Sequence, residues 1–276
     1  MTTSVTACFL CAWREKCQKR FSIGTDFALN VNCPDFTRDV TIRESELDDH
    51  KVKFHLEKWR QAASKPSPYI ITISRETGAG GSEVARRLAD ELKMDLIGGQ
   101  IIERVAKNAR MSTKVVETLD EKAVSRVDSM INSLFVSRHL SPDSYLRHLT
   151  WVLGTIGEHG NAIVVGRGAN FVLPKEITFR IRFVAPKEYR VQHFMKSRGM
   201  TKEEATKYVD KRDADRMGYV RNYFKADASD PSHYDLVINT EMTGIEGAAK
   251  IAVNAFHDWV KKSEQAAPTR KSARAK

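Results

Sequence analysis

The segment ISRETGAGGSEVARRL, at residues 73–88, is the feature that most restricts the fold of this chain. It overlaps a short β-branched run at 69–74, which predicts a strand, and it leads into a helical pattern at 82–93. One face of that helix carries Val84, Ala85, Leu88 and Leu92. A strand, a glycine-rich turn and a helix in this order direct backbone N–H groups and a helix N-terminus toward one point, where they can bind an anion.

In the rest of the chain, predicted strands also alternate with predicted helices. Apolar runs at 162–165, 178–185 and 235–239 are typical of buried strands, and helical sequence separates each run from the next. Strands that alternate with helices form a parallel sheet with helices on both faces. We therefore predict an α/β fold in which helices flank a parallel sheet.

A long helical stretch at 100–160 has no convincing strand of its own. Its last helix has Ser141 at the cap, Pro142 at the first helical position and Gly160 past the end. A final helix at 245–262 is expected to close the domain.

A charged helix begins at Thr201, where Glu204 three residues later completes a capping box. Within it Arg212 and Arg216 are four residues apart and share one face, with Asp213 beside them. Such spacing is equally typical of a solvated helix, so it does not by itself indicate a site.

The main domain is expected at 67–262, preceded by a poorly structured leader at 1–66 that contains one helix near 47–63. The formal net charge is +10, and six Lys or Arg against one Glu give +5 of it to residues 261–276. Residues 263–276 are expected to form a basic, disordered tail because they have little apolar content. A solvated tail is favoured over a nucleic-acid-binding arm, so we expect no specific nucleic-acid partner.

All four cysteines lie in the leader, at Cys8, Cys11, Cys17 and Cys33. Their spacing does not match a zinc ribbon or finger, so a reduced, loosely structured segment is favoured over a zinc or redox site. No apolar run reaches the roughly 18 residues of a membrane span, and no secretion signal is evident. We expect a cytoplasmic protein without a membrane partner.

The glycine turn departs from the phosphate-loop pattern Gly-x-x-x-x-Gly-Lys-Ser/Thr. Arg75 stands at the first glycine and Gly81 at the lysine, whereas Gly80 and Ser82 keep the pattern. Two interpretations remain open from the loop alone: a main-chain cradle for phosphate, or a turn that needs glycine for tight packing.

Four ordered blocks resemble the cytidylate kinase-like family, across about 69–260. They are ISRETGAGGSEVA at 73–85, VGRGAN at 165–170, DADR at 213–216 followed by Tyr219 and Arg221, and DPSHYDLVINT at 230–240. In that family a glycine commonly replaces the loop lysine. The resemblance implies a P-loop nucleoside monophosphate kinase fold with a five-stranded parallel sheet, a helical acceptor region within 100–160 and a lid at 201–224.

The resemblance also implies roles for particular residues. Binding of the ATP phosphates falls to Thr77, Gly78, Ala79, Gly80, Gly81 and Ser82. Mg²⁺ would rest on the hydroxyl of Ser82 or Thr77, on water and on the nucleotide phosphates. Arg167 and Arg212 would bind the acceptor phosphate. Since an arginine fork holds two phosphate oxygens, Arg75, Arg216 and Arg221 are expected to be the catalytic cations, with Asp213 orienting the lid arginines.

Two differences from the cytidylate kinase pattern leave the identity of the acceptor nucleotide undecided. Gly168 stands where cytidylate kinases have an aspartate, and residues 97–100 lack a second aspartate. The expected activity is ATP-dependent phosphorylation of a nucleoside monophosphate such as CMP or dCMP. The alternative is a nucleotide-binding sensor without turnover. The acceptor base and the oligomeric state are not predicted.

The breaker segment 64–68 predicts that the leader is dispensable. A chain that begins at Lys65 should unfold at the same temperature as the full chain and bind ATP with the same affinity, because the domain core begins after this segment. Thermal unfolding and ATP titration check this, and loss of either property would place the leader in the core.

Overall fold

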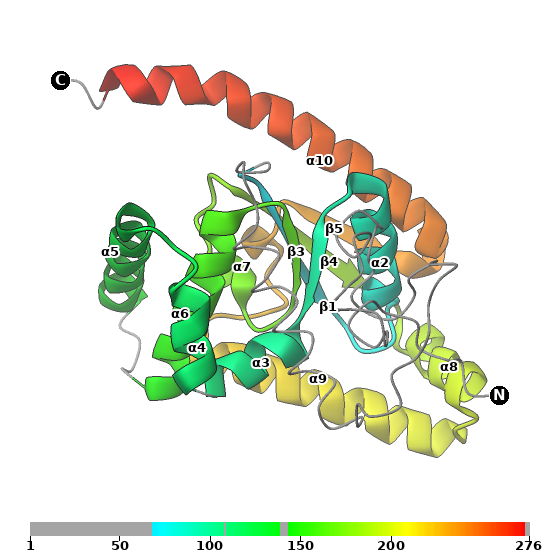
Figure 1. Cartoon of the computed structure of the whole chain (residues 1–276). Helices are drawn as coiled ribbons and strands as arrows, with labels where there is room; N and C mark the ends of the chain where they lie inside the picture. The colour runs from blue at the N-terminus through cyan, green and yellow to red at the C-terminus, as the bar shows by residue number, and fades with distance from the viewer. Residues whose placement is uncertain (1–67, 108, 139–142, 274–276) are drawn as a thin grey trace, which may run out of the picture.

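The computed structural model describes residues 68–107, 109–138 and 143–273. A single sheet of five parallel strands forms its centre, in the order β2-β3-β1-β4-β5 (Figure 1). The strands are β1 (Ile70–Arg75), β2 (Asp95–Gly98), β3 (Ala162–Val165), β4 (Thr178–Val184) and β5 (Leu236–Asn239). This confirms the predicted parallel five-stranded α/β fold.

The sheet lies between two helical layers, and its strands have buried apolar side chains that face both layers. On one face Ile71 and Ile73 of β1 pack into a buried cluster with α2 (Gly81–Leu92) and α10 (Thr240–Ala273). On the other face Ile70 packs with the helices that follow β2 and β3. Those helices are α3 (Gly99–Lys107), α4 (Ala109–Val116), α5 (Glu121–Arg138), α6 (Ser144–His159) and α7 (Ala169–Val172).

Helix α6 ends as predicted but begins later. Gly160 caps its C-terminus with a positive φ of 69°. The N-terminal cap is Asp143, whose side chain accepts a hydrogen bond from the Tyr145 N–H, so the expected cap at Ser141 is wrong. An aspartate satisfies the free N–H groups of a first turn as well as a serine does. Ser141, Pro142, the leader helix and the cysteines lie outside the described residues.

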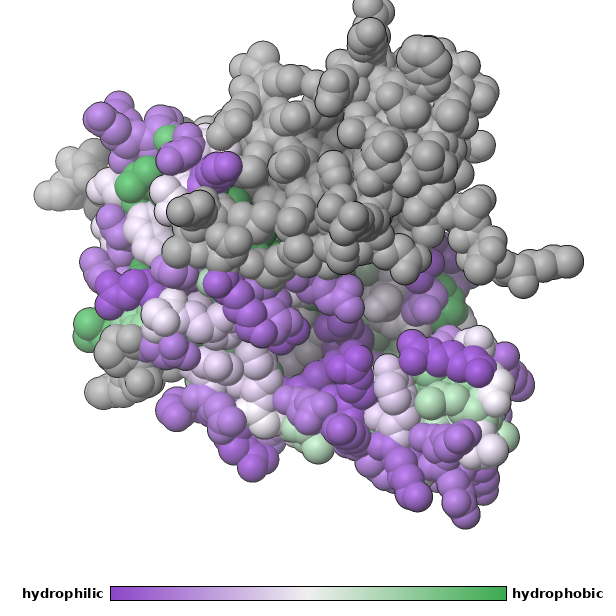
Figure 2. Space-filling view, turned by 60° about the horizontal axis from the view of Figure 1, so that its bottom comes forward, coloured by the Kyte–Doolittle hydropathy of each residue, from purple (hydrophilic) through white to green (hydrophobic). Residues whose placement is uncertain are grey.

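Two helices lie between β4 and β5, α8 (Lys187–Arg198) and α9 (Lys202–Phe224), and a short turn η3 (Pro231–His233) follows them. Helix α9 covers the segment predicted as the lid, and we keep that name for it. The capping box is present, since Thr201 accepts from the Glu204 N–H while the Glu204 carboxylate accepts from the Thr201 N–H. Figure 1 shows α9 running across one end of the sheet. The surface of this side is mostly hydrophilic (Figure 2).

Helix α10 is longer at both ends than the predicted 245–262. A kink at Gly244, with φ 64° and ψ 172°, joins a first helical turn to the main helix. The helix then continues to Ala273, where we expected a disordered tail. Extending an existing helix needs no new nucleus, which favours helical structure beyond the packed part. No helix in the described ranges has the length and apolar character needed to cross a membrane.

The C-terminal end of α9 is anchored in the core by Phe224. This residue is 1% exposed and stacks on Phe171 of α7, with ring centroids 5.4 Å apart. Its ring occupies the space beside Gly168, where a Cβ atom would lie 2.0 Å from Cε2 of Phe224. The aspartate of the related pattern is therefore excluded at position 168 by the end of the lid helix.

This packing predicts that Gly168→Ala lowers the free energy of unfolding by about 2 to 5 kcal/mol, since a positive φ and an overpacked contact are both unfavourable for alanine. Gly218→Ala is the matched control, because nothing lies within 4 Å of a Cβ atom there. The control should be neutral or slightly stabilising in its helix. Urea denaturation of both variants checks this, and equal stabilities would contradict the packing argument.

Candidate functional site

A cavity of about 870 Å³ lies at the carboxyl ends of the central strands, beneath α9. Its arginines are Arg75, Arg86, Arg167, Arg182, Arg190, Arg212 and Arg216, and its carboxylates are Glu76, Asp210, Asp213 and Asp215. Ligands of open α/β sheets collect at this edge. Seven arginines against four carboxylates leave an excess of positive charge, which suits an anionic ligand.

The loop glycines are required by packing. Gly78 and Gly80 have positive φ values of 86° and 68°. A Cβ atom on Gly78 would lie 2.9 Å from the carbonyl oxygen of Arg190, and one on Gly80 would lie 2.1 Å from Cδ1 of Ile245. The packing interpretation of the loop therefore holds, and it is compatible with a phosphate cradle because both need a main chain without side chains.

Of the six loop residues expected to bind phosphate, Ser82 lines the cavity and is exposed. The side chain of Thr77 is turned toward the lid, where its Oγ1 accepts a hydrogen bond from Arg216. Ser82 is thus the loop hydroxyl that is open to a ligand. The described residues contain no group of three or more His, Cys, Asp or Glu that could hold a metal. A single exposed hydroxyl such as that of Ser82 fits Mg²⁺ that is held mainly by nucleotide phosphates and water.

Arg75 extends from the end of β1 into a narrow space between two glycines. A Cβ atom on Gly81 would lie 2.7 Å from Cβ of Arg75, and one on Gly166 would lie 2.6 Å from its Nη1. Its Nε is buried without a hydrogen-bond partner. Within the described residues no carboxylate forms an ion pair with it. Burial, and then the charges of Arg216 and Arg167, lower the pKa of Arg75 to about 9.

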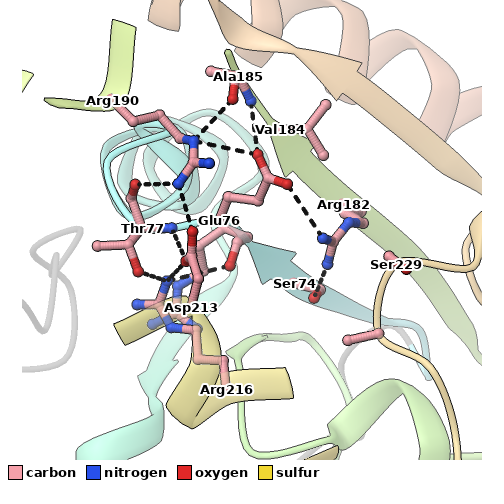
Figure 3. Close-up of polar contacts among 12 residues, drawn as sticks. Ser74, Glu76, Thr77, Arg182, Val184, Ala185, Arg190, Asp213, Arg216 and Ser229 are labelled. Atoms are coloured by element: carbon pink, nitrogen blue, oxygen red, sulfur yellow. Dashed lines mark hydrogen bonds and ion pairs between the residues drawn. The ribbon is translucent and has the colours of Figure 1, made fainter. Parts of the chain in front are cut away.

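Asp213 joins the lid to the loop (Figure 3). Its Oδ1 accepts a hydrogen bond from the Thr77 N–H at 2.8 Å, and its Oδ2 accepts one from Nη1 of Arg190 at 2.5 Å. Arg216 is farther away, with Nη1 3.9 Å from Asp213. Asp213 therefore pairs mainly with Arg190, a buried residue of α8 that we did not predict.

Arg216 reaches the loop directly. Its Nη1 donates to Oγ1 of Thr77 at 2.8 Å and to the carbonyl of Arg75 at 3.3 Å. Burial lowers the pKa of Arg216. The lid therefore places a second partly buried cation beside Arg75.

Arg167 lies on the opposite wall, at the end of β3, with a positive φ of 53°. Its Nε donates to the Gly99 carbonyl at 3.2 Å, and its guanidinium forms an ion pair with Glu103 of α3. Its charge also lies 5.3 Å from the ring centre of Tyr219 on α9. Arg167 thus forms a salt bridge with Glu103 and also lines the cavity.

The other two predicted arginines of α9, Arg212 and Arg221, differ in their position relative to the cavity. Arg212 lines the cavity, where its Nε lies 3.5 Å from the hydroxyl of Tyr208. Arg221 is exposed and does not line the cavity. It follows Arg216 by five residues, which turns it about 140° around the helix. The structure therefore does not bring Arg221 together with Arg75 and Arg216.

The cavity residues that escaped prediction include Glu76, Arg182 and Arg190. Oε2 of Glu76 accepts from the Ala185 N–H at 3.1 Å and lies 3.4 Å from Nε of Arg190. Side chains alternate between the two faces of β4, and Arg182 falls on a face that is covered by other elements. A buried charge is rare unless it is paired or functional. That burial is a signal that sequence reasoning could have used.

The parallel sheet, the glycine loop and the arginine-lined cavity beneath a helical lid define a kinase of the P-loop class. A family model described as the cytidylate kinase-like family matches residues 70–242. The chain belongs to the cytidylate kinase-like family.

Individual relatives agree with this assignment. A cytidylate kinase of Methanocaldococcus jannaschii is 27% identical over 196 residues, which cover 70% of this chain and 99% of the relative. A cytidylate kinase of Methanopyrus kandleri is 26% identical over 181 residues, covering 62% of this chain and 84% of the relative. The crystal structure of an uncharacterized protein from Eubacterium ventriosum has 22% identity and a TM-score of 0.55, covering 69% of this chain and 99% of that one. That likeness concerns the fold.

Because the charge of Arg75 is buried, we predict that removing it stabilises the fold and weakens the binding of phosphate ligands. Arg75→Met should raise the free energy of unfolding by on the order of 1 to 3 kcal/mol at pH 7, because methionine fills the same space without an unpaired charge. It should also abolish the stabilisation that inorganic pyrophosphate gives the wild-type protein.

Urea denaturation with and without pyrophosphate measures both effects. Arg126→Met is the control, since Arg126 is half exposed and paired with Glu158 on the protein surface. Its stability should change by less than about 1 kcal/mol. A less stable Arg75→Met protein would show that the Arg75 charge is already compensated.

Proposed function

We propose that this protein transfers a phosphoryl group from ATP to a nucleoside monophosphate. The observation that carries the proposal is the unpaired guanidinium of Arg75, buried between the cations of Arg167 and Arg216. Arg167 is paired with Glu103, so Arg75 and Arg216 are the cations with weak compensation, and two such like charges are unfavourable together unless an anion binds beside them. The names of the cytidylate kinase relatives support a nucleoside monophosphate as the acceptor.

We assign the roles of the cavity residues from their positions on its walls. Ser82 and the N-terminus of α2 face the donor phosphates, whereas Arg167 on the β3 side faces the acceptor phosphate. Arg75 and Arg216 then neutralise the charge on the group in transfer. Phosphoryl transfer needs mainly positioning and electrostatic stabilisation, which fixed arginines provide. Mg²⁺ bound with the nucleotide would add positive charge on the donor phosphates, and Ser82 would help to hold it.

The lid side chains exclude water and complete the site. Asp213 has both oxygens engaged by Thr77 and Arg190, so we assign it to lid closure rather than to proton abstraction. CMP and dCMP are the first acceptors to test, followed by the other monophosphates. A coupled assay for ADP, with and without Mg²⁺, tests turnover. ATP binding without ADP formation with any monophosphate would favour the sensor alternative.

The geometry predicts that Arg216→Ala lowers kcat at least about a hundredfold, because removal of one preorganised electrostatic donor commonly has an effect of this size. The affinity for ATP should change less, since Arg216 belongs to the lid. Lys207→Ala, which removes an exposed charge from the same helix outside the cavity, is the control and should leave kcat unchanged. Steady-state kinetics check this, and intact activity in Arg216→Ala would remove the residue from the site.

A further inference from the structure

Two arginines two residues apart on β4 have different surroundings. Arg180 and Arg182 point to the same face of the sheet, and each side chain is 10% exposed. The Asp235 carboxylate accepts from Nε of Arg180 at 2.9 Å and from its Nη2 at 2.5 Å, and Arg180 lies outside the cavity. Arg182 lines the cavity, and among residues 68–107, 109–138 and 143–273 its side chain makes one hydrogen bond, from Nη1 to Oγ of Ser74 at 3.3 Å. Arg182 is therefore a buried arginine with unused donors.

The charge of Arg182 is nevertheless compensated. Oε1 of Glu76 lies 3.6 Å from Nη2 of Arg182, close enough for an ion pair and too far for a hydrogen bond. The guanidinium also lies 5.6 Å from the ring centre of Tyr234. A guanidinium has five N–H donors, so most of them are available while its charge is balanced. Arg75 differs because no carboxylate of the part of the chain that the structure describes is paired with it.

The surroundings of Arg182 are held in place by Tyr234. The Tyr234 hydroxyl lies 2.8 Å from the Ala228 carbonyl and 3.3 Å from Oγ of Ser74. Ala228 and Ser229 line the cavity together with Ser74 and Arg182, and these four residues form what we call the Arg182 subsite. Figure 3 shows Ser229 on the loop that faces Arg182 and Ser74. The donors of Arg182 thus belong to a fixed wall of the cavity.

The balance of charge divides the cavity into two kinds of surface. Phosphate groups are favoured beside Arg75 and Arg216, where positive charge is in excess. A neutral polar group is favoured at the Arg182 subsite, because its charge is balanced and its hydrogen-bonding capacity is unused. An arginine fork pairs best with two adjacent acceptor atoms.

We propose that Arg182 recognises the base of the acceptor nucleotide through two adjacent hydrogen-bond acceptors. Cytosine presents such a pair at O2 and N3, and guanine presents one at O6 and N7. Uracil and adenine place a donor beside each acceptor on the corresponding edges. The acceptor class is therefore a cytosine or guanine nucleotide. This inference rests on the proposed function and adds a specificity-determining residue to it.

Binding without ATP tests the inference separately from turnover. Calorimetric titration with CMP, GMP, UMP, AMP and ribose 5-phosphate should show that the wild-type protein prefers CMP or GMP. Arg182→Met should weaken binding of the preferred nucleotide by about 5- to 100-fold, the range measured for bidentate base contacts. Ribose 5-phosphate, which has no base, should bind both proteins equally.

Arg182→Lys keeps the charge beside Glu76 and guards against a folding defect in Arg182→Met. It should also lose base discrimination, because an ammonium group cannot reproduce the fork. Arg180→Lys is the matched control on the same strand and face, and it should keep the wild-type order of nucleotides. Far-ultraviolet circular dichroism confirms that each variant is folded.

Two kinds of failure can be distinguished. If the wild-type protein binds none of the monophosphates, the proposed function itself fails. If it binds them with a preference for UMP or AMP, this inference is overturned and the proposed function stands. The same holds if both Arg182 variants keep the wild-type preference, or if they weaken ATP binding instead.

Discussion

The guanidinium of Arg75 occupies a space that exists because Gly81 and Gly166 have no Cβ atoms. In the phosphate-loop pattern, position 81 would be the lysine. Here a side chain at 81 would collide with the base of Arg75, so the loop can hold the arginine or the lysine but not both. The cation that the phosphate-loop pattern places at the helix N-terminus is here an arginine at the end of β1. The glycine loop, the β3 turn and the lid are each arranged around that buried charge.

A shared helix connects the two ends of the cavity. Asp213 and Arg216, midway along α9, contact the loop, while Tyr219 and Phe224 pack against Arg167 and Phe171 near its end. Because a helix moves largely as one body, contacts that a ligand made near Tyr219 would be transmitted to the loop through α9. The arrangement provides a physical basis for closing the site when both substrates are present.

Local patterns predicted β1, β3, β4 and β5, the capping box at Thr201 and the C-terminal cap at Gly160, because short-range chemistry determines these features. The short edge strand β2 (Asp95–Gly98) was missed. The partners within the cavity depend on contacts distant in sequence. Asp213 accepts from Thr77, 136 positions away, and no periodicity links the two. For Arg221 the family resemblance suggested a catalytic role that the structure does not support. The helical repeat turns this side chain away from Arg216. The Arg167–Glu103 pair likewise required the packing of α3 against the end of β3.

Glu76 explains how one cavity can contain so many arginines. Its two oxygens lie near Arg182 on one side and Arg190 on the other, and Arg190 in turn is bound by Asp213. These two carboxylates compensate two arginines that hold the lid and the sheet together. Arg75 and Arg216 remain with weaker compensation at the place where phosphates would meet. If Glu76 were absent, Arg182 would compete for the same anions, and the cavity would lose the contrast between a phosphate end and a neutral end. In the proposed arrangement, the position of this single carboxylate would allow the walls of the cavity to distinguish one end of an acceptor from the other.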